Sequence, residues 1–195
     1  MDGQLTLAEE LLLLAGGGDQ PLPWRLHYGV AGALLADLDL AGRLGLSADG
    51  RVTVTDHGPT GDDELDAVLA EITNGKPGRL EYWIRELGSV SRTGRLADRL
   101  ARRGDLRAQQ TELRSRVSRV LRELAGNDDR AAALAVILGA CRLAAKVFPT
   151  LDRRRIRQRI AELSRDQRVA GAARKAMGDA QLRAWLPDPL DFIFP

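Results

Sequence analysis

The sequence has very few residues of the kinds that form covalent cross-links, thiolate metal clusters or membrane spans. Cys141 is the only cysteine among 195 residues, so the chain forms no internal disulfide, which is typical of a reducing compartment. Only three of the 29 basic residues are lysines, and aromatic residues make up 4% of the chain. The apolar run Leu11 to Gly18 follows Glu9 and Glu10 and is too short to cross a bilayer. We expect a cytoplasmic protein with no signal peptide and no transmembrane segment.

What the sequence does contain is the composition of a folded globular protein. Hydrophobic residues make up 44% and charged residues 29% of the chain, which excludes wholesale disorder and low-complexity repeats. A chain of 195 residues buries enough apolar surface to fold without disulfides or structural metals.

The small net charge of +2 conceals an uneven distribution along the chain. Residues 1–75 carry three basic and thirteen acidic residues, a net charge of −10, whereas residues 76–195 carry +12. Such a division suggests a positive face directed at an anionic partner.

Apolar periodicity predicts a mainly α fold. Thr6 and Glu9 have the spacing of a capping box, and they precede a helix that ends at Gly16. The stretch 24–40 is apolar nearly all round and reads as a central helix, and 131–145 reads as the second buried helix. An Asp49-Gly50 turn followed by a β-branched second strand predicts a short hairpin over residues 42–55. The helix that contains 131–145 is expected to run over 128–148, and the other expected helices cover residues 63–73, 80–87, 96–103, 109–125, 152–165 and 167–186.

We therefore expect a compact multi-helix domain around two buried apolar helices, with one short β-hairpin. The domain is expected to span residues 5–186 and to be followed by a non-helical hydrophobic tail at 187–195, which contains the run Phe192-Ile193-Phe194.

Motifs of catalysis or metal binding are not evident. His27 falls in the central helix, and His57 falls in a loop, and neither belongs to a recognisable catalytic or metal motif. The acidic cluster from Asp62 to Asp66 opens a helix, where acidic residues cap and complement the helix dipole. We expect no catalytic residue, no metal and no cofactor.

Arginine-rich stretches are the most informative functional signal. Arg92, Arg95, Arg99 and then Arg102 or Arg103 recur every three to four residues, which places them on one side of a helix. A second stretch holds Arg153-Arg154-Arg155 followed by Arg157 and Arg159. Either run alone is also typical of a solvated helix face, but together with the acidic first part of the chain they favour an anionic partner, either a membrane surface or nucleic acid.

Six segments in order resemble the Golgi phosphoprotein 3 family. They are Leu5–Leu14, Ala31–Leu44, Pro59–Asp66, Tyr82–Ile84, Leu96–Leu106 and Asp128–Ala135. The resemblance implies a mostly α-helical domain that attaches peripherally to membranes by binding phosphatidylinositol 4-phosphate. In eukaryotic members it also implies recognition of the cytosolic tails of Golgi enzymes.

The resemblance also implies where a lipid headgroup would bind. The family uses a tryptophan before the central helix, a role that Trp24 can fill. At the family's three basic positions this sequence has Ala31, Val90 and Thr93, and Arg92 and Arg95 lie one or two residues from the last two. The family's hydrophobic hairpin that follows is replaced here by a predicted helix.

Our leading hypothesis is a non-enzymatic, peripherally membrane-associated adaptor that binds anionic phospholipid. Trp24, Arg92 and Arg95 are expected at the headgroup, and the cationic residues expected to face the membrane are Arg99, Arg102 and Arg103. A protein cargo or a second copy of the chain is a further candidate partner.

Two alternatives remain open at this point. One is a small-molecule enzyme or binding scaffold whose pocket is lined by Trp24, His27, Tyr28 and Trp83. The other is nucleic-acid binding, which is disfavoured because the helix before the hairpin is apolar all round and cannot be a recognition helix.

Overall fold

The computed structural model describes residues 4–16, 25–122 and 128–185, with side chains through residue 178. The prediction of a mainly α fold with one short hairpin is confirmed. The helices within these residues are α1 (Leu7–Ala15), α2 (Arg25–Leu40), α3 (Asp63–Asn74), α4 (Leu80–Leu87), α5 (Val90–Ala101), α6 (Arg107–Leu121), α7 (Asp129–Ala140), α8 (Ala144–Val147), α9 (Arg153–Asp166) and α10 (Arg168–Trp185).

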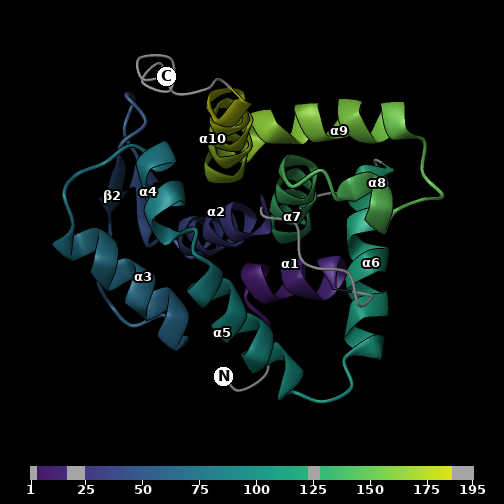
Figure 1. The fold of residues 1–195 in the computed structure, drawn as a ribbon, viewed down its shortest axis with the longest axis horizontal. Coiled ribbons are helices and arrows are strands. Elements are labelled where there is room, and N and C mark those ends of the chain that lie inside the picture. Colours follow the sequence, from purple (N-terminus) through teal and green to yellow (C-terminus); the bar gives the residue numbers. More distant parts are fainter. Residues whose placement is uncertain (1–3, 17–24, 123–127, 186–195) are drawn as a thin grey trace, which may run out of the picture.

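Helices α2 and α7 lie side by side at the centre of the molecule (Figure 1). Helices α9 and α10 cover them on one side and α1 and α5 on the other, while α6 and α8 lie at one end and the hairpin, α3 and α4 at the other. Gly29 of α2 allows α2 to approach the end of α7 closely, because a Cβ there would sit 2.3 Å from the Sγ of Cys141. Burial raises the pKa of that thiol to about 12, so Cys141 acts as a small core side chain.

The predicted first helix and hairpin are both confirmed. The Oγ1 of Thr6 accepts from the backbone N–H of Glu9 at 3.2 Å, and a carboxylate oxygen of Glu9 accepts from the N–H of Thr6 at 2.9 Å. Strands β1 (Leu44–Leu46) and β2 (Val52–Val54) pair antiparallel with Gly45 opposite Thr53. The turn between them uses Gly50 at a φ of 78°.

The helix predicted over residues 128–148 is wrong in one respect, because it is divided into α7 and α8. Arg142 adopts a φ of 59° and ends α7. The N–H of Leu143 donates to the carbonyl of Leu138 at 2.9 Å, and that of Arg142 donates to Gly139 at 3.0 Å, which is the Schellman pattern with arginine in the place usually taken by glycine. The turn brings Leu143, Val147 and Phe148 into the core.

Helix α5 begins six residues earlier than the predicted start at Leu96. Ser89 caps it by accepting from the N–H of Arg92 at 3.1 Å, a start that the small and polar residues before Leu96 concealed in the sequence. The predicted tail at 187–195 lies outside the described residues.

Candidate functional site

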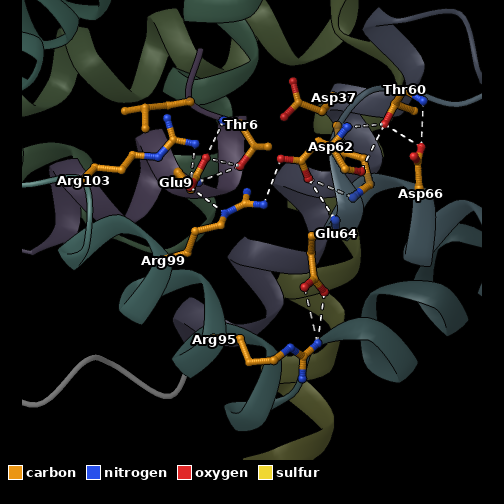
Figure 2. A network of polar contacts seen from close by, with 12 residues as sticks. Thr6, Glu9, Asp37, Thr60, Asp62, Glu64, Asp66, Arg95, Arg99 and Arg103 are labelled. Carbon is orange, nitrogen blue, oxygen red and sulfur yellow. Dashed lines mark hydrogen bonds and ion pairs between the residues drawn. The ribbon is translucent and has the colours of Figure 1, made fainter. Parts of the chain in front are cut away.

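The arginines predicted to share one side of a helix lie on α5 and in the turn that follows it, and we call them the α5 ridge: Arg92, Arg95, Arg99, Arg102 and Arg103. Helices α1 and α3 present carboxylates to this ridge. Thr93 and Leu96 are buried and fix the rotation of α5 against the domain. Arg95, Arg99 and the following Arg103 then lie along one flank, where Figure 2 shows them facing Glu64, Glu9 and Asp62. The ridge therefore faces acidic residues from the first part of the chain.

Arg92 is buried within the protein and 6% exposed. Its Nε lies 2.6 Å from a carboxylate oxygen of Glu64, and its Nη2 lies 2.5 Å from one of Glu71. Its Nη1 donates to the carbonyl of Leu87 at 3.0 Å. Arg92 thus joins α5 to α3 and to the end of α4. That Arg92 binds a lipid headgroup stays a prediction. Its guanidinium would have to give up these contacts to bind one.

The other ridge arginines differ in exposure. The side chain of Arg95 is 56% exposed and reaches Glu64 at 3.1 Å. Arg99 bridges Glu9 at 2.8 Å and Asp62 at 2.9 Å, and Arg103 reaches Glu9 at 3.5 Å. Arg102 is exposed and forms no ion pair with any residue that the structure describes. Of the predicted membrane-facing residues, Arg99 and Arg103 are therefore bound to a buried glutamate.

The acidic partners of Arg99 are themselves structural. Glu9 is fully buried and completes the capping box of α1. Asp62 caps α3 by accepting from the N–H groups of Glu64 and Leu65 at 3.0 and 3.1 Å, which confirms the capping interpretation of the acidic cluster. A cavity of about 370 Å³ lies beside them and is lined in part by Arg99, Arg103, Asp37 and Asp62.

Arg130 of α7 forms a second internal cluster with two buried carboxyl groups. Its guanidinium lies 3.1 Å from Glu10 and 2.5 Å from Asp37, and it donates to the carbonyl of Leu5 at 2.6 Å. Burial raises the pKa values of Glu10 and of Asp37, and the charge of Arg130 opposes the rise in both. The guanidinium of Arg130 therefore contacts two buried carboxyl groups, those of Glu10 and Asp37.

The positions at which the resemblance implies headgroup contacts carry no guanidinium. Ala31 is buried in α2, and Val90 is 71% exposed at the start of α5. Thr93 is buried, and its Oγ1 lies 3.0 Å from the Nδ1 of His27. Trp24 lies outside the described residues.

Two of the residues expected to line the alternative small-molecule pocket, Trp83 and Tyr28, pack against other parts of the protein. Trp83 is 4% exposed and packs edge-on against Tyr82 with 5.1 Å between ring centroids. Tyr28 packs against Gly88, where a Cβ would come within 2.8 Å of its ring. Because Trp24 is not described, this pocket stays a prediction.

Helix α9 carries a run of exposed arginines. Ile156, Ile160 and Leu163 bury one face of the helix, and the charged residues occupy the rest. Five arginines of α9 form no ion pair with any described residue, namely Arg153, Arg154, Arg155, Arg157 and Arg165. The sequence showed this run, but the ridge on α5 was the one assigned to the site.

The comparisons with known proteins agree with the fold. Within the described residues, every helix is too short or too polar to cross a membrane. No curated protein matches the chain. The family model described as Golgi phosphoprotein 3 (GPP34) matches residues 7–180. Because this match covers most of the chain, the protein belongs to the Golgi phosphoprotein 3 (GPP34) family.

Proposed function

We propose that the protein is a non-enzymatic adaptor that binds anionic phospholipid at the cytoplasmic surface of a membrane through an arginine-rich face. The observation that carries this proposal is the exposed run of arginines on α9, of which Arg153, Arg154 and Arg157 have no acidic partner among the described residues. Membership of the Golgi phosphoprotein 3 (GPP34) family supports it.

The α5 ridge contributes less of this face than its sequence suggests. Arg95 and Arg102 are exposed and available to a membrane, whereas Arg92 and Arg99 each contact two carboxylates. A guanidinium that is already neutralised by a nearby carboxylate adds little attraction to an anionic surface. The face therefore centres on α9 and includes the exposed arginines of α5 where both can reach the bilayer.

A run of unpaired arginines is sufficient for reversible membrane association. Each arginine near an anionic leaflet contributes about 1 kcal/mol, and the attraction falls off within a Debye length. Phosphatidylinositol 4-phosphate is the lipid that the family resemblance favours. The neutral residues Ala31, Val90 and Thr93 favour recognition of surface charge over recognition of that one headgroup.

A protein cargo or a second copy of the chain would be the partner that such an adaptor brings to the membrane. The carboxylates and arginines of the α5 region are largely engaged with one another, so we place the partner surface outside it.

The proposal is tested by sedimentation of the protein with vesicles. Neutral phosphatidylcholine vesicles are compared with vesicles that also contain phosphatidylserine or phosphatidylinositol 4-phosphate at equal surface charge. We expect recovery with both anionic vesicles at low salt and loss of recovery as salt rises. Equal recovery with neutral and anionic vesicles would reject the proposal.

Matched variants locate the face. R154Q/R157Q removes two charges from α9 and should lower the partition coefficient about thirtyfold at ~1 kcal/mol for each arginine. K76Q/R85Q removes two exposed charges near α4, at the other end of the molecule (Figure 1), and should change binding little. An equal effect of both variants would place the membrane contact elsewhere.

A further inference from the structure

A cavity of about 650 Å³ lies between the end of α6, the segment that connects α8 to α9, and the first turns of α9. Its floor includes the buried side chains of Leu121 and Ile156. Its walls carry three arginines, Arg122, Arg155 and Arg159. Its lining residues include none of the α5 arginines and neither Ala31, Val90 nor Thr93.

Two of the three guanidinium groups in this cavity have few polar partners among the described residues. The side chain of Arg155 has no polar partner among the described residues, and the only such contact of Arg122 is a long one of 3.4 Å from its Nε to the Oγ of Ser118. Arg159 is the anchored member, because its Nε donates to the carbonyl of Val120 at 3.2 Å. Within the part of the chain that the structure describes, the guanidinium groups of Arg122 and Arg155 thus have no acidic partner, and they lie beside a third guanidinium whose position is fixed.

The acidic groups near the cavity are already engaged. Asp152 caps α9 by accepting from the N–H of Arg155 at 2.8 Å. Glu162 accepts from Arg159 at 3.2 Å and from the amide of Gln158 at 3.3 Å. The hydroxyl of Thr150 is a further potential donor on the wall. The lining residues therefore carry a net positive charge, three arginines against Asp152.

We propose that this cavity binds a phosphate group, as a phosphomonoester or as inorganic phosphate. Guanidinium groups offer paired N–H donors that match the oxygens of a phosphate, and several of them around one concavity complement a dianion. The apolar floor lowers the local dielectric and strengthens those contacts. In this arrangement Arg159 is held in place by the Val120 carbonyl, and Arg122 and Arg155 donate hydrogen bonds to the phosphate oxygens.

The site rests on the proposed function only where the phosphate belongs to a lipid. A soluble phosphate would be bound by the same donors without a membrane. The two sources are separated by one experiment in solution and one with vesicles.

The solution experiment is a calorimetric titration of the full chain with inorganic phosphate at low ionic strength. R122Q/R155Q should weaken binding at least tenfold, because each lost charge-assisted hydrogen bond accounts for about that factor. The matched control R153Q/R157Q removes the same number of charges from α9 outside the cavity and should bind phosphate like the wild type. Equal weakening in both variants, or no measurable binding by the wild type, would overturn the proposal.

A lysine variant keeps the test valid if the glutamine variant fails to fold. R122K/R155K retains the charge of the cavity but loses the paired donors, so we expect weaker phosphate binding at an unchanged melting temperature. Binding equal to that of the wild type would show that charge alone attracts the anion, and the proposed recognition would be wrong.

The vesicle experiment identifies the source of the phosphate. Phosphatidic acid carries a phosphomonoester, and phosphatidylserine at equal surface charge does not. A preference for phosphatidic acid that R122Q/R155Q abolishes would assign the site to a lipid headgroup, whereas no preference beside intact phosphate binding would assign it to a soluble ligand. Failure to bind any anionic vesicle would reject the proposed function and leave the phosphate titration to decide this site.

Discussion

Helices α5 and α9 are both rich in arginine, but they differ in how many of these arginines form ion pairs within the domain. On α5, Arg92 and Arg99 each contact two carboxylates, from α3, its cap or α1. On α9, Arg153, Arg154 and Arg157 contact no carboxylate among the described residues. The difference teaches that a run of arginines in the sequence does not by itself identify a surface for an anionic partner.

The separation of charge along the chain has a structural use. Acidic residues of the first part, such as Glu9, Glu10 and Glu64, meet arginines of the second part inside the domain. The internal ion pairs hold α1 and α3 against α5 and α7. Only the arginines left over from this pairing are available for a partner.

The largest effect is expected where the internal pairing is most buried. Arg130→Ala leaves Glu10 and Asp37, both less than a tenth exposed, without their cation and should lower the free energy of unfolding by about 3–5 kcal/mol. Denaturant titration measures this loss. A loss below about 1 kcal/mol would mean that the internal pairs are as dispensable as the α9 charges.

Two arginines of α5 allow the stability contribution of a buried ion pair to be compared with that of an exposed one. Arg92→Ala removes hydrogen bonds to Glu64, Glu71 and the Leu87 carbonyl and should cost about 2 kcal/mol. Arg95→Ala removes only an exposed contact with Glu64 and should cost less than about 1 kcal/mol. If the two variants are equally stable, burial does not distinguish these arginines.

The pH dependence of stability should reveal the buried carboxyl group of Glu10. Burial raises its pKa in the folded protein above the usual 4.5, so the folded state holds the proton more tightly than the unfolded chain does. The stability that protonation contributes is full below about pH 4.5 and is lost as pH rises through the raised pKa. The free energy of unfolding of the wild type minus that of Glu10→Gln should therefore fall as pH rises.

Asp128 supplies the control of opposite sign. Hydrogen bonds from Arg116 at 2.9 and 3.0 Å lower its pKa below the usual 3.8. Its contribution is present above that value and is lost as pH falls through the lowered pKa. Asp128 also caps α7 by accepting from the N–H of Ala131 at 3.0 Å, and Asn preserves such a cap. The difference in the free energy of unfolding between the wild type and Asp128→Asn should therefore rise with pH. Equal slopes for both variants would contradict these pKa directions.

The smallest effect on stability is expected on α9. R154Q/R157Q removes two exposed charges that have no described partner and should change the free energy of unfolding by less than about 0.5 kcal/mol. The same variant is expected to lower binding to anionic vesicles. A large loss of stability would show that these arginines belong to the fold after all.

Most of the fold follows from local patterns. The capping box of Thr6 and Glu9, the Asp49-Gly50 turn and the two apolar helices α2 and α7 each depend on residues close together in the sequence. The break at Arg142 was missed because left-handed backbone at that position is usually taken by glycine. The early start of α5 was missed because its cap precedes small and polar residues without apolar periodicity.

The candidate site was less predictable than the fold. The spacing of Arg92, Arg95 and Arg99 correctly indicated one side of a helix. It did not indicate that Glu64 lies against Arg92 from 28 residues away, or that Glu9 lies against Arg99 from 90 residues away. The cavity between α6 and α9 likewise combines residues that carry no shared motif.

The sequence by itself determined the helices, the hairpin, the buried pair α2 and α7, and the family to which the chain belongs. Only the tertiary structure decided which arginines are engaged internally and which remain exposed. The physical reason is that periodicity and capping act over a few neighbouring residues, whereas the energy of an ion pair depends on the distance between charges in space and on their burial.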